Sequence, residues 1–444
     1  MRDTICALST PVGRGAIAII RVSGPDVIDV YRKLTHKHTP PKPRYAHLVS
    51  LFDREGHLID RGLCVFFKSP NSYTGEDMAE FYTHGGYIIP DLVLKTLYFY
   101  GIRQASPGEF TKRAFLSGKM DLLEAESVNE IINARTEEQF KRSLFALKGN
   151  LKRELDPILE IIKSILMEIE ARIEFEEDVG PLDREKVLSL FVELEEKLNE
   201  IIKRAKKGRY LSLGVQVAIV GSVNVGKSTL FNYILGKERS IVTPYAGTTR
   251  DTVHEEVEIS GLPVRFIDTA GIREAQDPVE KIGIERSKKA LKEADFAIFV
   301  EDATNLIQGK TKDLDFRIPF IKVANKIDLL NEKDRKKVPG DYIMVSAKYG
   351  DGMDTLIKEL EKQVKSHFYA KDSIILKSRE MGLIEGVLSE IKEAKKLFER
   401  NIDELELISY HLYEAEKRYR DIFGYIDMPE KVLDEIFKDF CIGK

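Results

Sequence analysis

The pattern of hydrophobic and polar residues changes along the chain near residue 120. Before that point, short apolar or alternating runs such as Ala16–Val22 and Leu63–Phe67 are separated by Gly and Pro and predict strands, while Ile88–Tyr100 predicts a helix. From Leu122 onward, long stretches dense in Glu and Lys predict exposed helices. The sequence therefore predicts a compact α+β domain followed by helical structure.

Two of the helical stretches carry an apolar stripe, and an α/β segment separates them. The stripes consist of Ile158, Ile161, Ile162, Ile165 and Ile169 in the first stretch and of Leu383, Val387, Ile391 and Ala394 in the second. The simplest arrangement is one helical domain into whose chain a nucleotide domain is inserted; the alternative is two independent helical domains. We expect segments 1–120, 121–211, 212–370 and 371–444, with the second and fourth forming the helical domain.

Composition narrows the class of protein. The chain of 444 residues has room for about three domains, and 43% hydrophobic with 32% charged residues is typical of a soluble globular protein. A net charge of −4 gives no overall basic field, so any RNA contact is expected from local patches or a partner. There is no signal-peptide core or membrane-length apolar run, and the three cysteines are far apart. These features predict a cytoplasmic protein without membrane contact.

Residues 221–228 form a complete G-x-x-x-x-G-K-[ST] phosphate loop, which chance would produce in about one chain of this length in fifty. It follows the alternating run Val215–Val220 and precedes a helix predicted from Ser228. The glycines let backbone N–H groups face phosphate oxygens, Lys227 reaches the β- and γ-phosphates as a catalytic cation, and Ser228 offers its hydroxyl to Mg²⁺. The predicted contacts in this loop are Asn224, Val225, Gly226, Lys227, Ser228 and Thr229.

Two later segments are expected to respond to the γ-phosphate. Gly247–Asp251 lies where the first switch of a GTPase belongs, and Thr249 is the predicted Mg²⁺ ligand, with Thr248 beside it; an ordinary polar loop is the alternative. Asp268 follows the predicted strand Val264–Ile267 and is expected to hold Mg²⁺ through water. The remaining contacts predicted there are Thr269, Ala270 and Gly271.

The downstream motifs select guanine. A buried Asp328 carboxylate would accept hydrogen bonds from guanine N1–H and the 2-amino group, and adenine offers neither. Ala347 is expected to give its backbone N–H to the base carbonyl. The predicted base contacts are Asn325, Lys326, Asp328, Ser346, Ala347 and Lys348. Because all these motifs occur in the order of a guanine-nucleotide domain, the sequence predicts that the protein binds and hydrolyses GTP.

The residue after Asp268–Gly271 is Ile272, which cannot orient the attacking water as glutamine does in Ras-like proteins. The group that positions this water must therefore come from elsewhere. Pro278–Arg286 carries carboxylates on a predicted helix just beyond the switch. From the residues alone, Glu280 is better explained as part of a solvated helix face than as a catalytic group.

Several motifs lie outside the GTPase segment, and they are more specific than a phosphate loop, which many families share. They are Gly13–Ala18, Arg21–Pro25, Ser72–Asp77, His84–Gly86, Pro107–Leu116 and Phe440–Lys444. With these motifs the chain resembles the MnmE (TrmE) family of bacterial tRNA-modification GTPases essentially from end to end. The resemblance implies a multidomain α+β and α/β fold, with an N-terminal α+β folate-binding-like domain that forms the homodimer, a discontinuous α-helical domain, and an inserted Ras-like P-loop GTPase domain.

The resemblance also implies a potassium-stimulated GTPase that is activated by dimerisation of its G domains. Asn224 matches the family's K⁺-coordinating asparagine, and backbone oxygens of the first switch complete the shell. These oxygens map to Thr243, Tyr245 and Thr248. K⁺ there would stabilise developing negative charge as an arginine finger does. Glu280 matches the glutamate that orients water in this family, so the resemblance makes it a catalytic candidate.

A folate site near the start of the chain is the next implication. It would bind a tetrahydrofolate derivative, 5-formyl- or 5,10-methylene-tetrahydrofolate, through residues matching Arg21, Glu80, Lys119 and Lys444. A carboxylate suits the donor edge of the pterin and cations suit its glutamate tail. The residues alone make Arg21 a strand-edge charge and Lys119 a solvated surface group. Cys441 matches the family's C-terminal Cys-x-Gly-Lys and is a candidate nucleophile or acid/base, the alternative being a tail anchor.

These implications describe a GTPase that installs an aminomethyl-type group, such as carboxymethylaminomethyl, at C5 of the tRNA wobble uridine. An MnmG-like flavoprotein would be its partner in a heterotetramer and would carry the FAD, whereas GTP, Mg²⁺ and K⁺ would bind this chain. The alternative is a ribosome-assembly switch of the Era or EngA type. Such proteins append RNA-binding modules with a basic surface, and the flanks of this chain are acidic helices instead.

Overall fold

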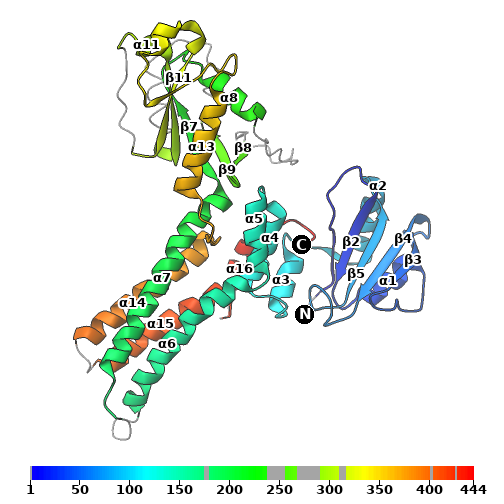
Figure 1. The fold of residues 1–444 in the computed structure, drawn as a ribbon. Helices are drawn as coiled ribbons and strands as arrows, with labels where there is room; N and C mark the ends of the chain where they lie inside the picture. Colours follow the sequence, from blue (N-terminus) through cyan, green and yellow to red (C-terminus); the bar gives the residue numbers. More distant parts are fainter. Residues whose placement is uncertain are drawn as a thin grey trace. The chain divides into compact units, whose positions relative to one another are not determined.

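The computed structural model describes residues 3–174, 180–237, 256–267, 291–309, 317–400, 404–425 and 428–444 (Figure 1). The chain divides into two compact units. Unit 1 consists of Met1–Ile132, Ala146–Arg153 and Glu416–Lys444, and unit 2 consists of Asn133–Phe145 and Glu154–Ala415. Each unit is therefore assembled from segments that are far apart in the sequence.

Unit 1 contains a six-stranded sheet in the order β3-β4-β5-β2-β1-β6. All neighbouring pairs are antiparallel except β1 with β6, which is parallel. The strands are β1 (Ile5–Leu8), β2 (Ile17–Ser23), β3 (Ala46–Phe52), β4 (Leu58–Phe67), β5 (Met78–His84) and β6 (Arg103–Gln104). The strands predicted at 16–22 and 63–67 are confirmed as β2 and the second half of β4.

Two helices, α1 (Val27–Thr35) and α2 (Ile88–Phe99), each pack one apolar face against this sheet. Val30 and Leu34 of α1, Val93 of α2 and Phe81 of β5 belong to one buried cluster. The remaining helices of unit 1 are α3 (Glu109–Leu116), α4 (Leu122–Asn133) and α16 (Glu430–Phe437). A second cluster joins α4 to α16 and to the chain end, through Leu122, Ala125, Leu433, Phe437 and Phe440.

Unit 2 contains a second six-stranded sheet, in the order β12-β11-β10-β7-β9-β8. β8 is antiparallel to β9, and every other neighbouring pair is parallel. The strands are β7 (Val215–Val220), β8 (Glu256–Ile259), β9 (Leu262–Ile267), β10 (Phe296–Asp302), β11 (Phe320–Asn325) and β12 (Tyr342–Met344). A mostly parallel sheet buried on both faces reads as continuous apolar runs, as β7 and β10 do.

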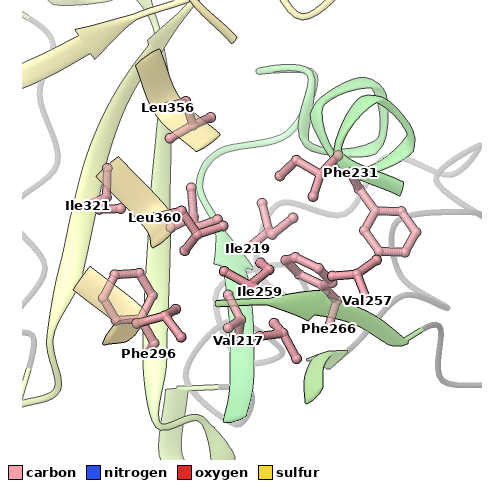
Figure 2. Close-up of a cluster of buried hydrophobic side chains, with 14 of the residues drawn as sticks. Val217, Ile219, Phe231, Val257, Ile259, Phe266, Phe296, Ile321, Leu356 and Leu360 are labelled. Atoms are coloured by element: carbon pink, nitrogen blue, oxygen red, sulfur yellow. The ribbon is translucent and has the colours of Figure 1, made fainter. Parts of the chain in front are cut away.

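Helices cover this sheet and complete its core. They are α8 (Lys227–Lys237), α11 (Ala303–Leu306), the 3₁₀ turn η1 (Ile327–Leu329), α12 (Glu332–Arg335) and α13 (Met353–Phe368). Figure 2 shows Phe231 of α8 and Leu356 of α13 packed around strand residues such as Val217, all within one buried cluster. Phe231 meets Phe266 of β9 edge to face at 5.5 Å between ring centroids. The packing fixes α8, and with it the loop that precedes it, on the sheet.

The remaining helices in the described ranges are α5 (Glu137–Leu147), α6 (Asn150–Glu174), α7 (Arg184–Leu213), α14 (Ser378–Arg400) and α15 (Leu405–Ile422). The isoleucine stripe predicted on α6 is confirmed, since all five residues are buried. On α14 the stripe is confirmed except at Leu383, which is half-buried while the next residue, Ile384, is buried. The buried side of α14 is the one that faces α7, since Phe398 packs on Phe191 and Lys395 pairs with Glu195 at 2.7 Å. This orientation buries Ile384 in place of Leu383.

Gly208 lies in α7 where another part of the chain crosses at close range. A Cβ built on Gly208 would lie 1.8 Å from the backbone oxygen of Ile374. Six residues later α7 ends at Gly214, which leads directly into β7. In the part of the chain that the structure describes, no helix combines the length and apolar character needed to cross a membrane.

Candidate functional site

The phosphate loop lies between β7 and α8, as the sequence predicts, with α8 beginning at Lys227 instead of Ser228. Its two glycines have φ values of +152° and +93°. A Cβ at Gly221 would lie 2.1 Å from the Val300 backbone oxygen, and one at Gly226 would lie 2.2 Å from Asn325 Nδ2. Asn224 is left-handed as well, with φ 63°. This backbone therefore requires glycine at both positions, and it curls the loop over the start of α8.

Lys227 occupies the first turn of α8, where the backbone N–H groups of the helix start are free of helical partners. Its Nζ donates to the backbone oxygens of Gly221 at 3.0 Å and Ser222 at 2.7 Å, which holds the ammonium over the loop. Ser228 is half-buried and Thr229 is exposed beside it. A cradle of backbone N–H groups with one cation fits a phosphate chain, and the Ser228 hydroxyl fits a hard cation such as Mg²⁺.

Asn325 joins the phosphate loop to the guanine motifs. It ends β11 and is 3% exposed. Its Nδ2 donates to the backbone oxygen of Val225 at 2.8 Å, and its Oδ1 accepts from the backbone N–H of Ala347 at 3.0 Å. The side chain therefore bridges two loops that are 100 and 22 residues away in sequence. Ala347 N–H, which sequence reasoning gave to the base, is already engaged by this bridge.

Lys326 and Asp328 follow Asn325 in the sequence and belong to the same guanine motif. Lys326 has φ 67°, and its Nζ lies 2.8 Å from Asp302 Oδ2. Burial acts to raise the pKa of Asp302, but hydrogen bonds from Lys326 and Thr304 outweigh it and hold the pKa below its usual value. Ser346, fully buried, donates to Asp328 Oδ1 at 2.6 Å.

The expectation of a buried Asp328 is wrong in this structure, because the residue is exposed on the short η1 turn. One of its oxygens is held by Ser346, so the carboxylate keeps a fixed direction while remaining open to a ligand. Lys348 is also exposed, beside Tyr349, whose hydrogen bond raises the pKa of the lysine. Asp328 and Lys348, one from each guanine motif, thus form an exposed edge that a planar base can approach.

Several predicted residues lie outside the described part of the chain. They are Thr243, Tyr245, Thr248, Thr249, Asp268, Thr269, Ala270, Gly271 and Glu280. Their roles as switch residues, metal ligands and water-orienting group remain predictions. Asn224, Val225, Gly226, Lys227, Ser228 and Asn325 are brought together, and they can hold a nucleotide phosphate chain next to a base site.

In unit 1, Arg21 and Glu80 form a cross-strand ion pair between β2 and β5. Arg21 donates to Glu80 Oε1 from Nε at 3.0 Å and from Nη2 at 2.8 Å, and Tyr82 donates to Glu80 Oε2 at 2.7 Å. The rings of Tyr73 and Phe110 lie 5.4 and 5.5 Å from the guanidinium carbon. The side chains of Arg21 and Glu80 are only 14% and 11% exposed, so this is a sheltered charged site.

The last residues of the chain dock beside this pair through their backbone. Arg21 Nη1 donates to the Gly443 oxygen at 3.2 Å, and Ser9 Oγ donates to the same oxygen at 3.1 Å. The N–H groups of Gly108 and Phe110 donate to the backbone oxygens of Cys441 and Lys444 at 3.3 and 3.2 Å. The structure thus brings Arg21, Glu80, Cys441 and Lys444 together, although the tail is 422 residues beyond Arg21.

Electrostatics distinguish the groups at this site. Burial, and then the nearby Arg21, lower the pKa of Lys444, while Cys441 and Glu80 act in the opposite direction. Burial and the Glu80 carboxylate raise the pKa of Tyr82 to about 12, so its hydroxyl remains a donor at neutral pH. Cys441 is half-buried, whereas Cys6 and Cys64 are buried. Burial raises the pKa of both buried thiols to about 12, and Cys441 is the most accessible of the three cysteines.

Lys119 lies apart from Arg21, Glu80 and Lys444, the other residues predicted for folate. It is exposed and lines a cavity of about 540 Å³, with Phe115 and Tyr425 among the walls and Asp121 and Lys152 among the charged groups. Burial raises the pKa of Asp121 to about 6. In the described residues, no hydrogen bond or ion pair joins Lys119 to Arg21 or Glu80. Arg21, Glu80 and Lys444 are therefore close together, and Lys119 is not in contact with them in the described residues.

Sequence reasoning missed the residues that complete the Arg21 site. Tyr82, Tyr73 and Ser9 all contact Arg21, Glu80 or the tail. Tyr82 has a local signal, because it lies two positions after Glu80 on the same strand and therefore on the same face. Tyr73 and Ser9 have none, since they reach the site from loops.

A phosphate loop on a mostly parallel sheet, bridged by asparagine to a guanine motif, defines a P-loop guanine-nucleotide-binding protein. A family model described as "GTP-binding protein TrmE N-terminus" matches residues 4–119, and one described as "MnmE helical domain" matches residues 122–441. The chain belongs to the MnmE (TrmE) family, whose members are GTP hydrolases. The multidomain α+β and α/β fold class expected from the sequence is confirmed.

Curated relatives match over the whole chain. The "tRNA modification GTPase MnmE" of Aquifex aeolicus is 42% identical, covering 100% of both chains. The proteins of the same name from Sulfurovum sp. and Thermosipho melanesiensis are 37% and 39% identical, covering 100% of this chain and 99% and 100% of theirs. Among solved structures, the FeoB G domain from Methanococcus jannaschii is similar at a TM-score of 0.22 and 24% identity, covering 34% of this chain and 98% of that chain.

Proposed function

We propose that this chain uses GTP hydrolysis to support modification of C5 of the wobble uridine in tRNA. Docking of the 441–444 tail beside Arg21 and Glu80 is the observation that carries the proposal. A GTPase that acted only as a switch would have no use for a second sheltered charged site next to a half-buried thiol. Full-length relatives named tRNA modification GTPases support the same conclusion.

The nucleotide half of the proposal rests on the phosphate loop. Lys227 and the backbone N–H groups at the start of α8 hold the phosphate chain, Ser228 offers its hydroxyl to Mg²⁺, and Asn224 offers its side chain to K⁺. These cations would neutralise charge that develops on the phosphates during hydrolysis. Thr249, Asp268 and the backbone oxygens of Thr243, Tyr245 and Thr248 complete the proposed metal shells. We assign Glu280 the orientation of the attacking water.

The second half concerns the Arg21 site. Glu80, already a double acceptor, suits the amino and N–H edge of a pterin, and Arg21 with Lys444 offers cations to carboxylates. A tetrahydrofolate derivative would supply the one-carbon unit, and Lys119 would contact another part of that molecule. Cys441 is proposed as the nucleophile or acid/base of this site. Its backbone oxygen takes part in the docking of the tail, and the thiol is the group to which we assign the chemistry.

The proposed assembly contains further components. A homodimer through the 1–120 domain would associate with an MnmG-like flavoprotein that carries the FAD, in a heterotetramer in the cytoplasm. With a net charge of −4, the chain has no overall basic field, which agrees with a partner that supplies much of the grip on tRNA. Within the chain, residues 121–211 and 371–444 would form the helical domain around the GTPase domain, 212–370.

Mass spectrometry of tRNA wobble nucleosides tests the proposal. Cells lacking the protein are complemented with wild type, with Cys441→Ser, or with Lys438→Gln as a control at an exposed lysine three residues before Cys441. We expect the C5-modified uridines to disappear in the deletion and to return with wild type and Lys438→Gln. Cys441→Ser should restore less than one tenth of them.

Each alternative result has a defined meaning. Unchanged wobble nucleosides in the deletion strain would refute the tRNA function and favour a ribosome-assembly role. Full restoration by Cys441→Ser would keep the tRNA function and remove the chemical role of the thiol. Immunoblotting of each variant establishes that the proteins accumulate equally.

A further inference from the structure

β8 and β9 form a hairpin, residues 256–267, between the two segments expected to respond to the γ-phosphate. Segment 238–255 precedes it and segment 268–290 follows it; both lie outside the described residues. β9 also pairs in parallel with β7, the strand that leads into the phosphate loop, with Ala218 opposite Ile267. The hairpin is therefore joined along one edge to the strand that leads into the phosphate loop, and in sequence it lies between the two expected switch segments.

Arg135 forms an ion pair with this hairpin. It lies in the turn between α4 and α5, and its Nη1 donates to both oxygens of Glu256, at 2.5 and 2.8 Å. Glu256 is opposite Arg265 on β9 and is ion-paired with it as well. The Glu256 side chain is only 9% exposed, so both partners interact with it in a sheltered environment where Coulomb attraction is weakly screened.

Other contacts fix the same segment against the hairpin. The backbone N–H of Arg135 donates to Gln139 Oε1 at 2.8 Å, which holds the turn before α5 in one conformation. Gly261, at the tip of the hairpin, faces α5, where a Cβ on the glycine would lie 3.4 Å from Glu138 Cβ. The hairpin thus contacts segment 133–145 at two places, Arg135 and Glu138.

We propose that Arg135 is a positioning residue that transmits the nucleotide state from the hairpin to segment 133–145. If binding of the γ-phosphate shifts the segments at the ends of the hairpin, Glu256 moves with β8, and an ion pair that engages both of its carboxylate oxygens obliges Arg135 to follow. Segment 133–145 continues in sequence from Ile132, the last residue of that part of unit 1. This inference rests on the proposed function and gives its GTP cycle a route out of the GTPase domain.

Hydrogen exchange of the full chain tests this route, with GDP or a non-hydrolysable GTP analogue bound in the presence of Mg²⁺. In wild type, amides of 133–145 should differ at least fivefold in exchange rate between the two nucleotides, the lower end of typical coupling between sites. In Arg135→Gln the difference should fall below twofold, and Arg135→Lys should retain an intermediate difference. A purely structural role would raise exchange equally in both nucleotide states and leave the ratio unchanged.

Arg142→Gln is the matched control, because Arg142 lies on α5, the helix that follows Arg135, and its partners in the described residues are Glu138 and the Lys371 carbonyl. It should keep the wild-type ratio. Amides of the phosphate loop, 221–230, report nucleotide binding in the same samples. If they respond while 133–145 does not, or if Arg135→Gln keeps the fivefold ratio, the inference is wrong and the proposed function stands. If the phosphate loop does not respond either, nucleotide binding fails and both fall.

Discussion

Replacing Asn325 with alanine removes both ends of the bridge between the phosphate loop and the guanine motifs. The backbone oxygen of Val225 and the backbone N–H of Ala347 lose their partner, and both residues are at most 4% exposed. An unsatisfied buried polar group costs about 1–3 kcal/mol, so the two together amount to roughly 2–6 kcal/mol. Part of this penalty appears in nucleotide binding, because the bridge holds the loop in the shape that receives phosphate.

A loss of about 3 kcal/mol corresponds to GDP binding roughly 100-fold weaker than in wild type. Isothermal titration calorimetry with GDP and Mg²⁺ measures it, and circular dichroism establishes that the variant is folded. Asn331→Ala is the control: this exposed asparagine caps α12 through the Asp334 N–H at 3.0 Å, and its loss should leave GDP affinity within threefold. A folded Asn325→Ala protein that binds GDP as tightly as this control would refute the reasoning.

Two further predictions concern stability. Gly208→Ala should lower the thermal unfolding midpoint although alanine favours helix, because the added Cβ would lie 1.8 Å from the Ile374 backbone oxygen. Gly382→Ala on α14 is the control, because no atom in the described residues lies within 4 Å of the added Cβ, and this variant should raise the midpoint slightly. An unchanged or raised midpoint in Gly208→Ala would show that α7 and the crossing chain can separate freely. Burial raises the pKa of Asp121 from 3.8 to about 6, so the folded state holds this proton more tightly than the unfolded state. As the pH rises from about 4 to about 6, ionisation of Asp121 therefore lowers the stability of unit 1. The loss amounts to up to about 3 kcal/mol. Asp121→Asn keeps an oxygen for the Glu124 N–H, so in urea unfolding it should gain stability over wild type at about pH 7 and lose that advantage near pH 4; the same difference at both pH values would contradict the assignment.

The phosphate loop was predictable because its geometry is encoded locally. Gly221 and Gly226 occur where a Cβ has no room, and Val215–Val220 ahead of them has the pattern of a buried strand. The bridge made by Asn325 was not predictable. It depends on β11 and β7 both lying beside β10, and sequence spacing gives no measure of that distance.

Exposure was harder to predict than secondary structure. Ile384, not Leu383, points into the helix pair, a rotation of one residue that the periodic pattern leaves undetermined. Asp328 is exposed although guanine recognition suggested burial, because its turn lies at the surface, where Ser346 holds one of its oxygens. Both cases depend on which neighbour packs against the element.

The Arg21 site shows a second limit. Its charged members were anticipated from a family resemblance, yet the tail docks through backbone oxygens of Cys441, Gly443 and Lys444. Backbone acceptors are present at every residue, so no side-chain pattern marks these three. Only Gly443, with φ +93° and a Cβ position 2.5 Å from the Leu8 oxygen, carries a residue type that the docking requires.

The hydrogen bond between Arg21 and Gly443 closes a loop of 422 residues, and this fixes an order of events during biosynthesis. At roughly 5–20 residues per second, a ribosome adds the tail about 20–80 seconds after Arg21 has been made. By then the nucleotide-binding domain has been synthesised in full. The Arg21 site is therefore completed after the nucleotide-binding domain, and a nascent chain passes through a stage at which the phosphate loop exists and the docked tail does not.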